Sequence, residues 1–316
     1  MNKWGIVVCT YGNSEQRLTM LLESLKKTNI PYDLWVRGSV HTYQQELVQR
    51  DVCERFGGQY MESARYRVYE PTRAIRIVQN PYIAILKDDI VMGDNWLEAM
   101  DYFWENNEKV GCVGWSYVQA EELVRAGIWE KEDDFWTKPM PDMTRREIIE
   151  RIPNWAFRSG APFATGEGEV TEGKYMVDAR VPMDEPTVTD CPCPMAWTLK
   201  REDFVRFDGF WYVGPGDNSA MYADLCWDDG LICVNIPFPV IFHRRQTSSK
   251  EYCEDHGLIN LGYDPQFWWT PRLDKEYRER WGGPTWVDRR IFTMNSYVLP
   301  LTESGFMKTL QYWIPA

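Results

Sequence analysis

The first 116 residues alternate strand-forming runs with stretches of helical periodicity, and this alternation constrains the fold more than any other feature. Strands are predicted at 5–9, 32–36, 82–86 and 110–113, with a further extended stretch around Tyr60. Helices are predicted from Ser14 onward and at 43–56, 72–79 and 96–104. Such alternation is typical of a mostly parallel sheet with helices on both faces. The sequence therefore predicts an α/β fold.

The helix after the first strand has the clearest pattern. Ser14 is of a residue type preferred at helix N-caps, and we expect it to cap this helix. Leu18, Leu21, Leu22 and Leu25 then recur at helical spacing. One face of this helix is therefore predicted to pack against the sheet.

The middle of the chain differs from both flanks. Residues 117–190 contain 9 Lys and Arg against 16 Asp and Glu, a net charge of −7 out of −12 for the whole chain. We interpret this stretch as an insertion. It is either a lid or acceptor-binding element, or a solvated and loosely packed set of loops. Strand and helix signals return at 195–199, 201–205 and 219–227, followed by an extended run at 232–240 that prolines break.

Composition excludes several classes of protein. Hydrophobic residues make up 44% and charged residues 26%, which is ordinary for a globular chain and argues against disorder. A net charge of −12 disfavours nucleic acid and anionic membranes as partners. No apolar run reaches the 18 or so residues of a membrane helix, and a strand is expected directly after Met1. A cytoplasmic location without a signal peptide is therefore expected.

Eight cysteines are spread along the chain. Cys9, Cys112 and Cys233 lie in apolar runs, where cysteine usually acts as a small buried hydrophobe. Cys191 and Cys193 have a spacing that would suit a metal pair, but no second pair follows at zinc spacing, so a structural role is favoured. Free thiols are expected rather than disulfides.

Two adjacent carboxylates, Asp88 and Asp89, directly follow the predicted strand at 82–86. Ligands of open α/β sheets bind beyond the carboxyl ends of the strands. Carboxylates placed there can hold Mg²⁺ or Mn²⁺, with phosphate oxygens and water completing the coordination. A solvated turn is the alternative for this pair.

Asp217 follows glycines and a proline at the predicted start of a helix. Aspartate is favoured at an N-cap, and a carboxylate presented to a cleft there can also act as a general base. The two roles are compatible.

His243 stands at the end of an apolar strand and before two arginines. The chain has three histidines in all. Neutral imidazole is a common metal ligand, so in a chain that also has a carboxylate pair, His243 is a candidate ligand.

These features occur in an order that resembles the GT-A nucleotide-sugar glycosyltransferases, most closely the inverting family 2. Val7 to Asn13 (VVCTYGN) resembles the family's opening strand and nucleotide loop. Leu86 to Val91 (LKDDIV), followed by Asn95-Trp-Leu97, resembles its DXD region and the helix start after it. Arg201 to Phe210, then Gly216-Asp217, is similar to the family's acceptor-side segment, and His243 to its late histidine. The resemblance covers residues 4–116 and 194–245.

The resemblance implies a GT-A domain with two halves and additions. Residues 1–116 would form the nucleotide-sugar-binding half, 117–190 an acidic insertion or lid, 191–245 the acceptor and catalytic half, and 246–316 a C-terminal extension. The implied reaction is transfer of a sugar from a nucleoside-diphosphate sugar to an acceptor hydroxyl, with inversion and with Mn²⁺ or Mg²⁺. The acceptor is expected to be a carbohydrate or another small molecule.

Site residues follow from the same resemblance. Asp89 and His243 would hold the metal, and Asp217 would be the general base, with Asp224 as the rival. The nucleotide would be bound by Thr10, Tyr11, Arg37, Arg73 and Asp88, the last near the ribose. Arg73 has a surface salt bridge as its alternative role.

The chain departs from the family pattern at two places. Lys87 occupies the first DXD position, and the second strand ends in Val36-Arg-Gly-Ser39 where the family has a base-reading aspartate. Two further hypotheses therefore stay open. One is a glycosyltransferase that acts on a modified DNA base, and the other is an inactive GT-A fold that serves as a binding protein.

Overall fold

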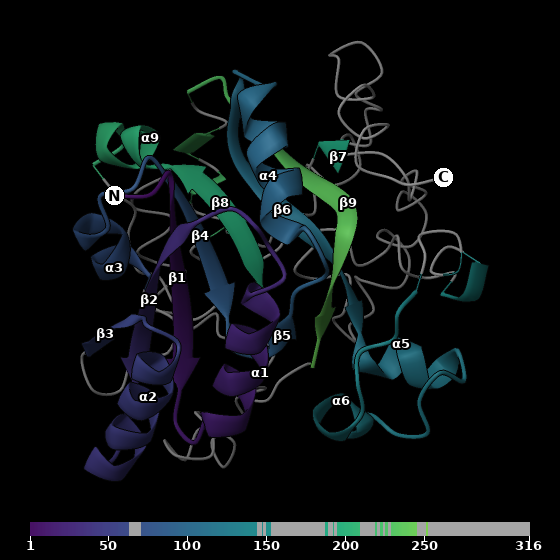
Figure 1. Ribbon diagram of the computed structural model, residues 1–316. Helices are drawn as coiled ribbons and strands as arrows, with labels where there is room; N and C mark the ends of the chain where they lie inside the picture. Colours follow the sequence, from purple (N-terminus) through teal and green to yellow (C-terminus); the bar gives the residue numbers. More distant parts are fainter. Residues whose placement is uncertain are drawn as a thin grey trace, which may run out of the picture.

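A nine-stranded sheet organises the part of the chain described by the computed structural model (Figure 1). The description covers residues 1–62, 71–143, 195–208 and 229–244, with 147, 150–152, 187–188, 192, 219, 222–223, 225–226 and 251. The strands are β1 (Trp4–Tyr11), β2 (Tyr32–Ser39), β3 (Gln59–Glu62), β4 (Tyr82–Lys87), β5 (Ile90–Val91), β6 (Val110–Gln119), β7 (Thr187–Val188), β8 (Ala196–Lys200) and β9 (Ile232–His243). The helices are α1 (Glu15–Leu25), α2 (Tyr43–Arg55), α3 (Thr72–Ile77), α4 (Trp96–Glu105), α5 (Ala120–Arg125), α6 (Asp134–Thr137) and α9 (Arg201–Arg206).

The strand order is β3-β2-β1-β4-β8-β6-β9-β5, and β7 pairs with β9. Strands β1 to β4 are parallel to one another. Because β8 is antiparallel to both β4 and β6, and β9 is parallel to β6, the long strands β6 and β9 run in the same direction as β1 to β4. Only β8 and the two-residue strands β5 and β7 run the other way among the described strands. The predicted mostly parallel α/β sheet is confirmed.

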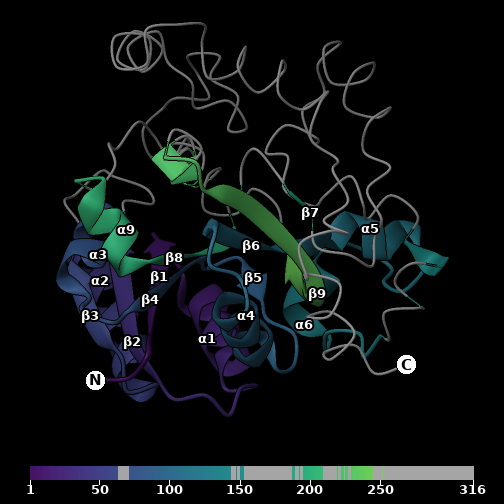
Figure 2. The ribbon, with the colours of Figure 1, turned by 90° about the horizontal axis from the view of Figure 1, so that it is seen from above.

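Helices cover both faces of the sheet, as the alternating pattern predicts. Alternate residues of β1 show this: Ile6 and Val8 pack in one core cluster with α1, α2 and α4, whereas Val7 and Cys9 pack in another with α3 and α9. Seen from above, α1 and α4 lie on one side of the sheet and α9 on the other (Figure 2). The leucine face of α1 is fully buried, as predicted.

Two local expectations need correction. Ser14 occupies the N-cap position of α1, but its side chain makes no capping hydrogen bond. Its ψ of 9° lies outside the extended region that directs a capping side chain to the backbone N–H groups. Thr42, at ψ 152°, caps α2 through a complete capping box. Prolines also do not break the run at 232–240, because β9 continues through them with a register shift against β6, where Trp115 pairs with Ile236 and Tyr117 with Ile241.

The beginning of the acidic middle segment packs on the sheet. Leu123, Trp129 and Phe135, from α5 and α6 and the loop between them, share an apolar cluster with Val118 of β6 and Phe242 of β9. Strand β6 itself runs past residue 116 to Gln119. Residues 153–186 of this segment lie outside the described residues. None of the described helices has the length and apolarity needed to cross a membrane.

Candidate functional site

The carboxyl ends of several strands bring the candidate site together at one edge of the sheet. Strand β1 ends at Tyr11 and its parallel neighbour β4 at Lys87. Strand β4 is followed by a turn at Asp88 and Asp89 and then by β5, whose Ile90 pairs with His243 at the end of β9. The arrowheads of β1, β4 and β9 accordingly point toward the lower part of Figure 1. Residues distant in sequence therefore meet here.

Asp88 is fully buried and lies between β1 and α1. Its Oδ2 accepts a hydrogen bond from the Thr10 hydroxyl at 2.7 Å and one from Arg17 Nε at 3.3 Å. Burial raises the pKa of Asp88, and the charge of Asp89 adds to this, although Arg17 acts in the opposite direction. Thr10 and Asp88, both predicted site residues, are thus in direct contact.

Asp89 and His243 form the second pair. Their side chains are buried, and His243 Nε2 lies 3.6 Å from Asp89 Oδ2. Burial opposes ionisation of Asp89, but the neighbouring His243, when protonated, together with Lys87 and Arg17 lowers the pKa of Asp89. The backbone N–H of Arg244 donates to the Asp89 carbonyl at 2.9 Å, which fixes the two chain segments to each other.

The donor set of this pair fits a divalent cation. A separation of 3.6 Å is too long for a hydrogen bond, yet one ion at roughly 2.1 Å from each atom can contact both. The buried His243 Nδ1 has no hydrogen-bond partner among the described residues, and the ring meets Tyr117 edge-on at 5.5 Å. Carboxylate oxygen together with imidazole nitrogen suits Mn²⁺ better than Mg²⁺, which prefers oxygen alone.

Arg17 belongs to the same group, although the sequence interpretation missed it. Its Nη2 donates to the Tyr11 carbonyl at 2.7 Å and contacts a carboxylate oxygen of Glu251 at 3.1 Å, while its Nε reaches Asp88. Arg17 directly precedes the buried Leu18 on α1. One signal in the sequence could have identified Arg17. It is the one arginine of α1, it lies beside the leucine face, and α1 follows the predicted nucleotide loop.

Glu251 closes the loop between β1 and α1. Its Oε1 accepts the backbone N–H of Asn13 at 2.7 Å. Gly12 has φ +60°, a conformation that favours glycine, and a Cβ there would lie 2.2 Å from the same oxygen and displace the Glu251 carboxylate. Glu251 comes from the predicted C-terminal extension, and no local pattern assigns it to the site.

The remaining predicted residues are placed differently. The Tyr11 ring is buried in the second core cluster and meets His41 edge-on at 5.7 Å. Arg37 is buried in β2, whereas Arg73 is exposed in the first turn of α3. Asp217 and Asp224 lie outside the described residues. The structure therefore joins Thr10, Asp88, Asp89 and His243 at one edge, and their roles stay predictions.

Comparisons with known proteins give similarity only at the level of structure. No family model matches the chain, and no curated protein matches it. The chain is similar to mannosyltransferase PcManGT from Pyrobaculum calidifontis, solved with GDP-Man and Mn²⁺, at 13% identity and TM-score 0.48, covering 93% of this chain and 74% of that one.

Two further solved structures are similar to the chain. S. aureus TarS is 12% identical with TM-score 0.46, over 94% of this chain and 44% of that one, so this chain spans less than half of TarS. Glucosyl-3-phosphoglycerate synthase from Mycobacterium tuberculosis, solved with Mn²⁺, UDP and phosphoglyceric acid, is 10% identical with TM-score 0.43, over 85% and 80%. In fold, the described part of the chain is a mostly parallel sheet with helices on both faces.

Proposed function

We propose that this chain is a metal-dependent inverting glycosyltransferase, which transfers a sugar from a nucleoside-diphosphate sugar to an acceptor hydroxyl. The observation that supports it most is the buried pair of Asp89 and His243, with Oδ2 and Nε2 3.6 Å apart at the carboxyl edge of the sheet. An α/β sheet binds ligands at this edge. An aspartate is ionised at neutral pH, as a metal ligand must be.

In this proposal, Asp89 and His243 hold Mn²⁺ or Mg²⁺. When bound, the ion acts as a Lewis acid that neutralises the charge of the diphosphate leaving group. Lys87, which replaces an acid of the family pattern, lowers the pKa of the neighbouring Asp89. Lysine at position 87 therefore leaves the site with one carboxylate fewer than the family pattern, and it favours the ionised form of Asp89.

The nucleotide side of the site would be built on β1 and α1. Thr10 and Arg17 both donate to Asp88 Oδ2, so they hold this carboxylate in one orientation. In our proposal, Asp88 and Thr10 face the nucleoside, while Arg73 reaches the diphosphate or the base from the first turn of α3. Arg17 is a positioning residue, because it acts through Asp88 and the Tyr11 carbonyl.

Asp217 is our candidate for the general base, with Asp224 as the rival. The acceptor oxygen would attack the anomeric carbon while the carboxylate takes the hydroxyl proton. The bond from that carbon to the diphosphate oxygen breaks with inversion, through an oxocarbenium-like transition state. A general base contributes typically 10²–10⁴-fold.

A turnover assay tests this function. Release of nucleoside diphosphate is measured with a panel of nucleotide sugars, Mn²⁺ and oligosaccharide acceptors. We expect one donor to be turned over, and Asp89→Asn and His243→Ala to lose at least about 10²-fold in turnover. Asp94→Asn, whose carboxylate is 78% exposed and paired with Lys27, is the matched control and should keep full activity.

The other outcomes of this assay decide between the hypotheses. Donor binding without release, in the presence of every acceptor, would contradict catalysis and favour a binding protein. Transfer to DNA that contains hydroxymethylated bases would overturn the carbohydrate acceptor and leave the donor chemistry standing. The net charge of −12 opposes DNA as the acceptor.

A further inference from the structure

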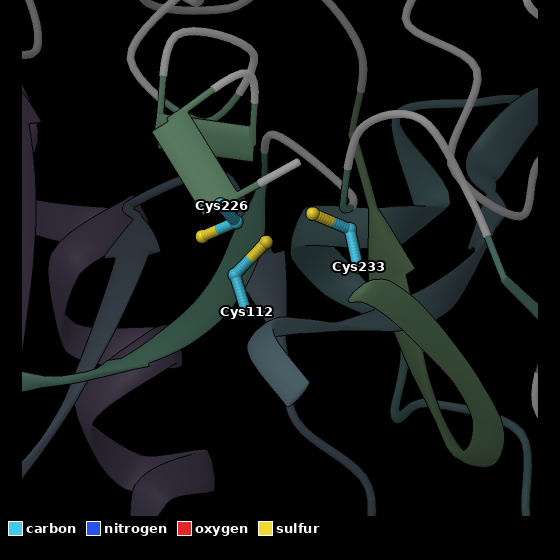
Figure 3. Close-up of side chains that lie close together, drawn as sticks. All are labelled: Cys112, Cys226 and Cys233. Carbon is cyan, nitrogen blue, oxygen red and sulfur yellow. The ribbon is translucent and has the colours of Figure 1, made fainter. Parts of the chain in front are cut away.

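Three cysteines from three separate elements meet in the core, away from the site described above. Cys112 belongs to β6, Cys233 to β9, and Cys226 to the helical residues 225–226. All three are fully buried, and their sulfur atoms lie within 4.8 Å of one another. Figure 3 shows Cys112 and Cys226 side by side, with the side chain of Cys233 pointing toward them.

The backbone brings these three residues together by two devices. Cys112 and Cys233 are direct partners in the parallel pairing of β6 with β9. The helical turn that carries Cys226 is closed by Gly230 at φ +76°, with the N–H of Leu231 donating to the Cys226 carbonyl at 2.9 Å. This helix end is a Schellman-type closure, and it returns the chain directly into β9. The convergence is therefore fixed by pairing and capping.

Space for the third thiol comes from a glycine. A Cβ on Gly111 would lie 2.5 Å from Cys226 Sγ, so a larger residue beside Cys112 would displace that thiol. Trp197, Leu199 and Phe204 lie in the same core cluster. The Tyr222 side chain and the charges of Asp203 and Arg206 also interact with these thiols. The three sulfur atoms are thus buried together in the largely apolar core on this face of the sheet.

We propose that Cys112, Cys226 and Cys233 bind Zn²⁺ at a structural site. Thiolates are soft ligands that select such ions over Mg²⁺ or Mn²⁺. Zinc–sulfur bonds of about 2.3 Å place tetrahedral ligands roughly 3.8 Å apart, so the sulfur atoms need to close by about 1 Å or less from their present limit of 4.8 Å. The described residues supply three ligands, and a tetrahedral ion takes one more.

Charge favours Zn²⁺ over Cu⁺ at this position. Each ligating thiol loses its proton, so three thiolates leave a net charge of −1 with Zn²⁺ and −2 with Cu⁺. The cost of burying charge in an apolar core rises steeply with its size. Bound zinc would join β6, β9 and the helical turn that carries Cys226. It would thereby stabilise β9, whose far end carries His243, roughly 30 Å from Cys233 along the extended strand.

Cobalt titration tests the site on the full chain. Protein that has been reduced and freed of metal is titrated with Co²⁺, and thiolate-to-cobalt charge-transfer absorption is followed. We expect one equivalent of Co²⁺ to give this absorption and Zn²⁺ to displace it. Cys112→Ser, Cys226→Ser and Cys233→Ser should each abolish it. Cys53→Ser is the control, because Cys53 is also buried but lies on α2 outside the cluster.

A double variant outside the cluster provides a test that does not depend on the folding of the cluster variants. In Cys191→Ser/Cys193→Ser, the cobalt absorption from the three core thiolates should persist, and its complete loss would overturn the assignment. Absence of the absorption in the wild-type protein would overturn it as well. So would a disulfide that joins two of Cys112, Cys226 and Cys233, found by peptide mapping of unreduced protein.

Discussion

His243 Nε2 lies 3.6 Å from Asp89 Oδ2, although the two residues are more than 150 positions apart in the chain. Backbone hydrogen bonds hold this relationship, since Ile90 pairs with His243 and the N–H of Arg244 donates to the Asp89 carbonyl. A donor pair fixed by the sheet is pre-organised. A cation bound there would need little rearrangement of the chain.

Arg17→Lys is predicted to weaken nucleotide binding about tenfold. Lysine keeps the charge but cannot reach Asp88, the Tyr11 carbonyl and Glu251 together, because it lacks the planar fork of the guanidinium. Titration with the cognate nucleoside diphosphate measures the loss. Arg55→Lys, at a 48% exposed side chain of α2, is the control. Equal affinities for the two variants would show that Arg17 does not position the site.

Gly12→Ala is predicted to be more damaging than Gly57→Ala. Both glycines have positive φ, at +60° and +69°, so both alanines carry backbone strain. Only at residue 12 would the new Cβ meet the Glu251 carboxylate, at 2.2 Å, whereas nothing lies within 4 Å at residue 57. We expect Gly12→Ala to lower the free energy of unfolding by about 1 kcal/mol more than the control in urea unfolding. Equal losses would contradict the contact.

Asp33→Asn tests a charged contact outside the site through its pH dependence. Hydrogen bonds from Asn80 and Asn2 lower the pKa of Asp33 from its ordinary 3.8 despite partial burial. Because the pKa of Asp33 is lower in the folded than in the unfolded protein, the ionised carboxylate stabilises the fold above pH 3.8. This stabilisation is lost as the pH falls through the pKa of Asp33 in the folded protein.

The variant should therefore be less stable than wild type by about 1 kcal/mol at neutral pH. The gap in free energy of unfolding should narrow below pH 3.8. Asp51→Asn, at a 70% exposed carboxylate, is the control and should show a smaller gap. A gap for Asp33→Asn that widened in acid would have the wrong sign.

Asp217→Asn is predicted to lower turnover by about 10²-fold or more, with little change in donor affinity, as loss of a general base requires. Asp224→Asn should do much less. Single-turnover kinetics, together with donor titration, separate the two effects. If Asp224→Asn shows the larger loss, Asp224 is the base and Asp217 is a helix cap.

Much of the fold could be predicted because periodicity is a local property. The leucines of α1 and the apolar run of β4 each indicate their element and its buried face. The two-residue strands β5 and β7 could not be predicted, because such short segments form only where a neighbour such as β9 already exists. The continuation of β9 beyond Ile236 likewise involves a shift in register against β6 that the local sequence does not indicate.

The site was predictable only in part, for a related reason. Asp89 and His243 stand at strand ends, where the sequence marks candidates without showing that they meet. Glu251 reaches the loop after β1 from a distant segment, and no spacing rule indicates such a contact. The burial of Cys112 and Cys233 was predicted from their apolar runs, but their convergence with Cys226 depends on strand pairing and a helix end.

Calorimetric titration of nucleoside diphosphates in the presence and absence of Mn²⁺ tests the central claim most directly. For the wild-type protein, we predict that one nucleoside diphosphate binds at least about tenfold more tightly with Mn²⁺ than without it. In Asp89→Asn, this Mn²⁺ dependence should disappear, while the weaker metal-free binding and the melting temperature stay near those of Asp94→Asn. Mn²⁺-dependent affinity that is unchanged in Asp89→Asn would contradict the metal site and the function proposed from it.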